Sequence, residues 1–256
     1  MCCFSRPVDS VTKTRIFARL VSKDHQAIAY QMRLDAPEEL AMILPIPVVQ
    51  PAKEDAVKFI NLEGYESFFK DLEKGFPKPP TLQSRAAGGV YKAASAQLVV
   101  QSVGSFDASF VPTVADFSRL DARFKLPEGT WDKLPTYANY GFAVFKLKKG
   151  NAKVHPMAFT FPSEVAKDAK LYFPTVHIHD GKVHGKEGFD HLLYAQTWTG
   201  AAMPSRNWVE SPQLASQFSK AEKSKGLIWD KGHVYRRSMV GKLKNEDVIV
   251  LPVATG

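Results

Sequence analysis

Cysteine is nearly absent from this chain. Only two of its 256 residues are cysteines, and they are adjacent, as Cys2 and Cys3. A disulfide framework needs cysteines that are spread along the chain, so a disulfide-stabilised scaffold is excluded. From residue 4 onward the fold is built without cysteine.

Long apolar runs are also missing. No stretch reaches the roughly 18 consecutive apolar residues that a membrane-spanning helix needs, so we expect no membrane span. The first residues, MCCFSRPVDSVTK, also lack the apolar core of a secretory signal. The sequence therefore predicts a cytoplasmic protein.

Several well-known catalytic and nucleotide-binding motifs do not occur. The sequence contains no Walker loop, no G-x-G-x-x-G, no H-E-x-x-H and no G-x-S-x-G. Each of these motifs places particular side chains or backbone amides around a phosphate, a metal or a nucleophile. Nucleotide-dependent and serine-hydrolase functions therefore have no support.

Positive charge is in excess, but it is scattered. The net charge is +8, and Lys and Arg gather only in short runs such as residues 146–153 and 219–226. A nucleic-acid surface needs these charges on one face with stacking aromatic side chains between them. We therefore do not expect nucleic acid as a partner, although the charge favours a weak attraction to anionic substrates or surfaces.

The composition is that of a globular protein, with 45% hydrophobic, 11% aromatic and 23% charged residues. A chain of this length can bury a substantial core. No Ser/Gly-rich linker or low-complexity tract marks a boundary, so we expect a single domain over residues 1–256.

Alternation of apolar and polar residues predicts mostly strands. The expected strands cover residues 14–21, 27–34, 40–48, 96–103, 107–112, 234–240 and 248–253, with a long hairpin over 141–162 that turns at Gly150–Asn151. Helical spacing predicts helices over residues 54–62, 65–76 and 213–223, with shorter ones over 113–120 and 128–134. The predicted fold class is α+β, with a mostly antiparallel sheet and several short helices.

Two segments have a similar pattern. Residues 29–48 and residues 157–176 each contain a strand, an acidic corner, an apolar strand and a proline at similar spacing. A duplicated half-domain would produce this pattern, and so would chance in a strand-rich chain. Two pseudo-repeated halves are therefore one reading of the fold.

The first 50 residues carry a family resemblance. The order C-C-F-S-R-P-V, A-I-A-Y-Q-M-R-L and L-A-M-I-L-P-I-P-V resembles an uncharacterised bacterial family whose members open with a cysteine motif and carry a Leu-Pro-x-Pro strand. The resemblance extends weakly to residues 139–176. It implies a similar arrangement of strands and no particular activity.

The strongest chemical signal is T-V-H-I-H-D-G-K-V-H at residues 175–184. An Asp-Gly pair between alternating runs favours a two-residue type I′ hairpin, with Asp180 and Gly181 at its tip. In that register His177, His179 and His184 share one face. Three imidazoles on a rigid hairpin are typical of a copper, iron or zinc site with open positions, and a solvated histidine face is the alternative.

Other residues extend this predicted site. His191 is a candidate fourth ligand or supporting residue, and Asp180 or Asp190 is placed to accept a hydrogen bond from the remote N–H of a ligating imidazole. Removal of Met1 would leave Cys2 with a free amine and a thiol on one residue, which together can bind a metal or act as a nucleophile. We therefore also predict Cys2 and Cys3 as catalytic candidates, with burial in a strand or membrane acylation as alternatives.

These features lead to three functional hypotheses. The first is a metal-dependent enzyme, a copper- or iron-type oxidoreductase acting on a small molecule. Its ligands would be His177, His179, His184 and His191, with Cys2 and Cys3 as further ligands or reactive thiols. The second is an amidohydrolase with Cys2 as N-terminal nucleophile. The third is a non-catalytic protein that binds a metal or a partner.

Overall fold

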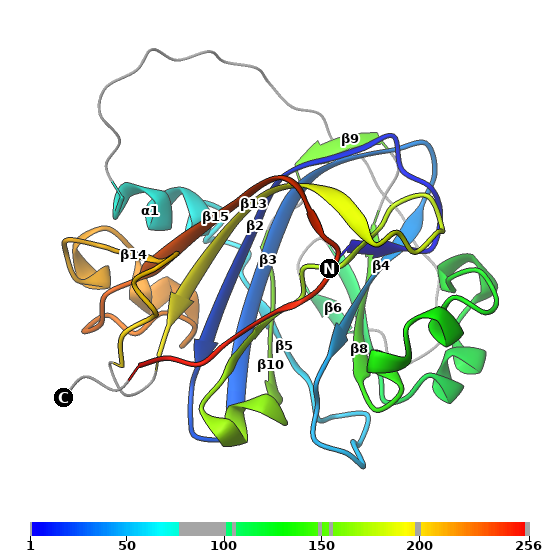
Figure 1. The fold of residues 1–256 in the computed structure, drawn as a ribbon, viewed down its shortest axis with the longest axis horizontal. Coiled ribbons are helices and arrows are strands. Elements are labelled where there is room, and N and C mark those ends of the chain that lie inside the picture. The colour runs from blue at the N-terminus through cyan, green and yellow to red at the C-terminus, as the bar shows by residue number, and fades with distance from the viewer. Residues whose placement is uncertain are drawn as a thin grey trace.

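The structure is a computed structural model that describes residues 2–76, 101–103, 106–147, 150–153, 156–197 and 201–253. Most of the described residues belong to two large β-sheets. Figure 1 shows the strands of both sheets, with the short helices of residues 115–137 (green) at one end of the molecule.

The larger sheet has eight strands in the order β14-β15-β13-β2-β3-β10-β5, with β9 also paired to β3. All of its pairs are antiparallel except β13 with β2, which are parallel. The strands are β2 (Ser10–Leu20), β3 (His25–Ala36), β5 (Lys58–Asn61), β9 (Gly150–Lys153), β10 (Met157–Pro162), β13 (Lys186–Gln196), β14 (Val209–Glu210) and β15 (Tyr235–Lys244).

The smaller sheet has six strands in the order β12-β1-β4-β8-β7-β6. These are β1 (Cys2–Phe4), β4 (Leu40–Ile46), β6 (Gln101–Val103), β7 (Phe106–Val111), β8 (Gly141–Leu147) and β12 (His177–Ile178). A separate two-stranded sheet joins β11 (Leu171–Phe173) to β16 (Val248–Val250).

Helical structure is limited among the described residues. The one α-helix, α1 (Phe68–Lys74), ends at Gly75, as its sequence predicts. The remaining helical segments are short 3-10 turns: η1 (Ala115–Arg119), η2 (Ala122–Phe124), η3 (Trp131–Lys133), η4 (Pro135–Tyr137), η5 (Val165–Asp168), η6 (Ala215–Gln217) and η7 (Ala221–Ser224).

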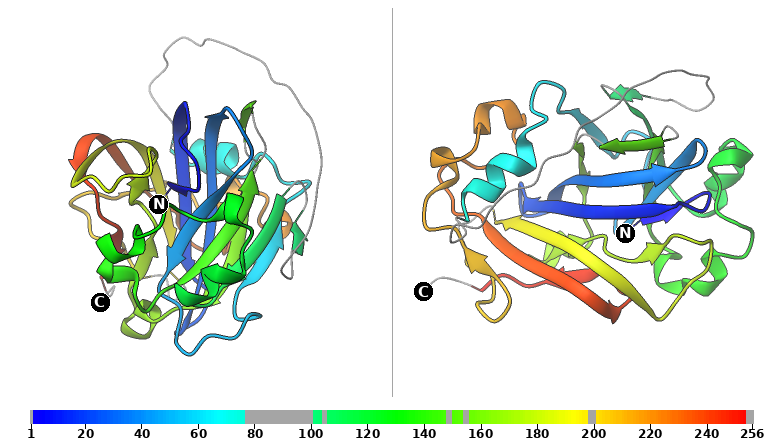
Figure 2. Two further views of the ribbon diagram at one scale, coloured as in Figure 1. Left: turned by 90° about the vertical axis from the view of Figure 1, so that its right-hand side faces the viewer. Right: turned by 90° about the horizontal axis from the view of Figure 1, so that it is seen from above.

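The larger sheet is the middle layer of the molecule. Successive side chains of a strand point to opposite faces, and in β2 both faces are apolar. Ile16 belongs to the main core, which also contains the residues of β4 and β8, whereas Phe17 packs in a second core with Phe68 of α1. One face of this sheet is therefore covered by the smaller sheet and the other, in part, by α1 and residues 215–234 (Figure 2).

The mostly antiparallel, sheet-rich character of the fold is confirmed, and several local predictions are wrong. Residues 58–61 of the predicted helix 54–62 form strand β5, and the predicted helix 213–223 is reduced to 3-10 turns. The 141–162 hairpin does not form, because β8 pairs with β4 and β7 while β10 pairs with β3 and β5. The duplication of halves stays a prediction, as does the single domain.

No helix in the described part of the chain is long and apolar enough to cross a membrane.

A single carboxylate ties the segment before β12 to the rest of the molecule. Asp247 lies in the loop between β15 and β16, and its Oδ1 accepts hydrogen bonds from the backbone N–H of Thr175 (2.8 Å) and Val176 (3.0 Å). Its Oδ2 accepts from the hydroxyls of Tyr137 and Tyr172, both at 2.7 Å. Burial, together with the negative charge of Asp247, raises the pKa of both tyrosines above the ordinary value, so both remain donors.

We expect Asp247→Asn to destabilise the protein by about 2–3 kcal/mol, because the amide nitrogen cannot accept the bonds made by one of the two oxygens. Glu246→Gln, a matched change at the neighbouring exposed carboxylate, should stay within about 0.5 kcal/mol. The measurement is equilibrium urea unfolding. Equal midpoints for the Asp247→Asn and wild-type proteins would contradict this role of the carboxylate.

Candidate functional site at the N-terminal strand

The histidine segment lies directly beside the N-terminal strand. β12 pairs in parallel with β1, so that Cys2 lies opposite His177 and Cys3 opposite Ile178. In Figure 1 the N-terminus accordingly lies next to this segment. The two chemically unusual segments of the sequence, which lie far apart along the chain, are therefore neighbours in the fold.

The predicted hairpin around Asp180 and Gly181 is wrong. A type I′ turn needs positive φ at both central residues, and here only Gly181 has it, at 75°. The Asp180 side chain instead accepts a hydrogen bond from the Lys182 N–H at 3.0 Å, which stabilises a turn through the side chain. β12 ends at Ile178, so His177 and His184 are not cross-strand partners.

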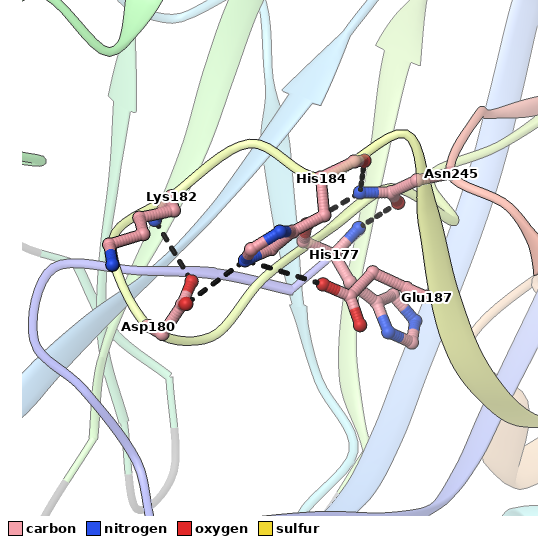
Figure 3. Close-up of polar contacts among 6 residues, drawn as sticks. All are labelled: His177, Asp180, Lys182, His184, Glu187 and Asn245. Carbon is pink, nitrogen blue, oxygen red and sulfur yellow. Dashed lines mark hydrogen bonds and ion pairs between the residues drawn. The ribbon is translucent and has the colours of Figure 1, made fainter.

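The side chain of Asn245 bonds to the edge of β12 at which the predicted hairpin would have placed a second strand. Asn245 accepts a hydrogen bond from the His177 N–H at 2.7 Å and donates to the His177 carbonyl at 2.9 Å. The same amide donates to the His184 carbonyl, also at 2.9 Å (Figure 3). Asn245 thus satisfies the free edge of β12 as a neighbouring strand would, and closes the 177–184 loop.

His184 is separated from the other histidines of the predicted ligand set. Its Nε2 lies 3.0 Å from Asp180 Oδ2 and 4.0 Å from Glu187 Oε1, on the exposed side of the loop (Figure 3). Asp180 therefore accepts a hydrogen bond from an imidazole N–H as expected, but the donor is a solvated histidine.

The other three histidines form one stack, in which His177 and His191 are buried and His179 is partly buried. The His177 ring lies 4.8 Å from His179 and 4.7 Å from His191, with interplanar angles of 21° and 26°. His177 is 3% exposed and His191 is 1% exposed. Phe189 packs against His177 at 4.4 Å and Phe4 against His179 at 5.6 Å. The imidazoles are therefore part of an aromatic layer between β1, β12 and β13.

One hydrogen bond links two of these rings. His177 Nε2 and His191 Nε2 are 2.9 Å apart, so one nitrogen donates a proton and the other accepts it. The Nδ1 atoms of both rings and Nε2 of His179 are buried without a hydrogen-bond partner among the described residues. The nearest carboxylate oxygen to His191 Nδ1, from Asp190, is 3.7 Å away, which is beyond hydrogen-bond distance.

The surroundings keep these rings neutral. Burial, followed by repulsion from a charged His179, lowers the pKa of His177 from 6.5 to about 3. Burial also lowers the pKa of His179 to about 4 and that of His191 well below its usual value. A proton added to any of the three would be an unpaired buried charge, which is costly.

The stack does not have the geometry of a metal site. Ligand nitrogens around one tetrahedral zinc stand about 3.3 Å apart with their lone pairs convergent. Here the rings lie face to face, and the Nε2 pair is joined by a hydrogen bond instead. No group of three or more His, Cys, Asp or Glu side chains in the described ranges could hold a metal ion. The predicted metal centre of His177, His179, His184 and His191 is therefore not assembled.

The structure describes the side-chain burial of Cys3, but only the backbone pairing of Cys2. Cys3 is fully buried and its backbone pairs with both Ile178 and Ile43, which fits the alternative that it packs in a strand. Cys2 is described only through its backbone pairing with His177. The catalytic role of either thiol stays a prediction.

Comparisons with known proteins find solved structures with a similar fold. No protein-family profile matches the sequence, and no curated protein matches it either. Among solved structures, baculovirus P35 is similar with a TM-score of 0.51 and 14% identity over 95% of this chain and 97% of P35. A mutated baculovirus P35 after caspase cleavage gives a TM-score of 0.50 and 15% identity over 94% of this chain and 100% of that chain. The caspase-8/P35 complex gives 0.47 and 13% over 94% and 96%.

These likenesses establish a shared fold and leave the bacterial-family resemblance untested. They also correct the leading functional hypothesis. The fold is shared with baculovirus P35, a mutated form of which was crystallised after caspase cleavage, and the described histidines do not form a metal-binding group. The copper- or iron-type oxidoreductase is therefore wrong.

Sequence reasoning missed the residues that position the histidine segment. Asn245 and Asp247 carry no local signal, because they belong to a short polar loop that resembles many others. The strand β13, which brings His191 to His177, was also not predicted. Its alternation over residues 186–196 was the available signal.

We expect the stability of the protein to fall steeply as the pH drops from about 6.5 to about 4. In that window the unfolded chain takes up protons at His177, His179 and His191 and the folded chain does not, so each contributes a loss of up to about 1.4 kcal/mol per pH unit. Unfolding by urea at a series of pH values measures the slope.

Two variants test the assignment. His177→Phe should reduce the slope, since it removes one buried titrating ring and keeps an aromatic side chain in the layer. His184→Gln is the matched control, because it removes an exposed histidine outside the stack and leaves the three stacked rings in place. A slope that responds to His184 and not to His177 would contradict the buried stack as the source of the acid sensitivity.

Proposed function

We propose that this chain is a non-catalytic protein that binds a partner protein, and that the partner is a protease of the caspase class. The observation that carries the proposal is the likeness to baculovirus P35 over nearly the full length of both chains. The match at a TM-score of 0.50 to a mutated P35 after caspase cleavage names the class of partner. Cleavage requires the protease to bind the chain that it cuts.

The structural match to P35 extends over nearly all of both chains. It therefore supports a mode of action shared with P35 more strongly than a match over one short motif would. The alignment covers 95% of this chain and 97% of P35, so the likeness is not confined to one local segment. At 14% identity the surface chemistry has diverged, and the particular protease bound by this chain would differ with it.

The histidine stack also supports a binding role. His177 and His191 are buried, neutral and hydrogen-bonded to each other, and Cys3 is enclosed by β4 and β12. General acid-base catalysis needs a group that reaches the substrate with a pKa near the working pH. These side chains instead hold the N-terminal strand in the core.

The test is complex formation with purified proteases. The full chain is mixed with each member of a panel of purified caspases, and the mixture is analysed by size-exclusion chromatography with light scattering and by inhibition of a fluorogenic peptide substrate. We expect at least one caspase to elute as a stable complex with this chain and to lose activity in proportion to the amount added.

Baculovirus P35 is the positive control and an unrelated protein of similar pI is the negative control. An excess of an active-site peptide ligand should prevent the complex if binding occurs at the protease active site. If P35 forms complexes under these conditions and this chain forms none with any caspase, the proposed partner class is wrong.

A further inference from the structure

The outer face of the larger sheet is only partly covered. Within β13, Tyr194 is buried against Phe69 of α1 and against Phe76, which lies two residues after the end of α1. Towards the beginning of β13, the side chains on the same face are exposed. The opposing residues of β15, from Ser238 to Lys244, are exposed on this face as well. β13 and β15 run side by side in Figure 1.

The exposed part of this face is basic and has an apolar centre. Cross-strand pairing places Lys186 opposite Lys244, Gly188 opposite Lys242 and Asp190 opposite Val240. Val240 is 71% exposed, the largest exposure among the large exposed hydrophobic residues of the described chain. We call these six residues the β13–β15 face.

Two of the three lysines of this face have no ion-pair partner among the described residues. Lys186 and Lys242 form no ion pair with any described residue, and Lys244 pairs with Glu246. Like charges directly opposite each other, as Lys186 and Lys244 are, destabilise an antiparallel pair. The one carboxylate, Asp190, already accepts a hydrogen bond from the Lys13 N–H at 2.6 Å. The face therefore presents unpaired positive charge at a cost to the sheet.

Gly188 has no side chain, so the backbone of β13 is open beside Lys186 and Lys242. A glycine within a strand weakens it and often marks a place where another backbone approaches closely. A Cβ at Gly188 would meet no atom of the described residues within 4 Å, so packing among these residues does not require glycine here. The open backbone lies directly opposite Lys242.

We propose that the β13–β15 face binds an extended acidic segment of a partner protein. Alternate side chains of an extended segment repeat every 6.6–7 Å or so, which is also the spacing of Lys242 and Lys244 along β15. Carboxylates at alternate positions would meet the lysines, an apolar side chain would cover Val240, and the backbone would pass over Gly188. The proposal does not depend on the partner being a caspase.

A protein segment fits this face better than a nucleic acid does. Nucleic-acid surfaces combine cations with aromatic side chains on which bases stack, and none of the six residues of the face is aromatic. The exposed Val240 offers an apolar contact that a phosphate backbone would not use.

The probe for the test is a fluorescein-labelled synthetic peptide with the repeat Glu-Thr-Glu-Thr-Val, whose two Glu side chains and one Val side chain lie on one face when the peptide is extended. Its binding to the full chain is measured by fluorescence anisotropy, and the contact residues are mapped by amide chemical-shift changes. We expect saturable binding with the largest shifts at residues 186–190 and 240–244. A peptide with Lys in place of Glu should not bind.

Three variants locate the site. Lys186→Glu with Lys242→Glu should weaken binding at least about tenfold, because two attractions become repulsions. Gly188→Val should also weaken it at least about fivefold while leaving stability unchanged or higher, because valine fills only the open approach and favours the strand. The control is Lys23→Glu with Lys223→Glu, the same change of net charge at two exposed lysines away from this face, and it should change affinity by less than about twofold.

Three results would overturn the proposal. One is the absence of saturable binding of the acidic peptide. Another is an equal loss of affinity in the two double variants, which would mean that net charge alone attracts the peptide. The third is binding of duplex DNA or of anionic vesicles at the β13–β15 face under conditions in which the peptide does not bind there.

Discussion

The histidine segment depends on hydrogen bonds from one short loop. Asp247 accepts the N–H groups of Thr175 and Val176, and Asn245 satisfies both the N–H and the carbonyl of His177. A buried backbone group without a partner costs about as much as a lost hydrogen bond. Without this loop, the free edge of β12 would be unsatisfied. Because β1 is hydrogen-bonded between β12 and β4, the position of the N-terminal strand depends on the same two side chains.

The imidazoles contribute to this arrangement as aromatic rings rather than as ligands. His177 and His191 share one proton through their Nε2 atoms and stack with His179, while Phe4 and Phe189 close the layer. A core that contains neutral histidines is stable only above the pH at which the unfolded chain takes up protons. Acid sensitivity is therefore a direct consequence of using histidine at these positions.

The same fold leaves the two faces of the larger sheet unequal. One face is buried against the smaller sheet, and α1 covers only part of the other, so that Val240 and Lys242 are exposed on a strand whose inward residue Met239 is buried. In this chain the sheet-rich fold thus combines an enclosed N-terminal strand with an open basic surface. The open surface is the one to which the proposed binding of an acidic segment is assigned.

The sequence by itself determined the local structure wherever periodicity is strong. Alternation in residues 27–34 gave strand β3, and the apolar spacing of residues 65–76 with Gly75 gave α1, because side-chain direction repeats every two residues in a strand and every 3.6 in a helix. Only the tertiary structure decided which strands are neighbours. The Asp-Gly pair at residues 180–181 favoured a hairpin. The backbone of His177 instead pairs with β1 on one side and hydrogen-bonds to the side chain of Asn245 on the other. Both contacts join residues that are far apart in the chain. Such pairings depend on the whole packing arrangement and leave no local pattern, which is why the metal site that the histidine spacing predicted is absent from the described fold.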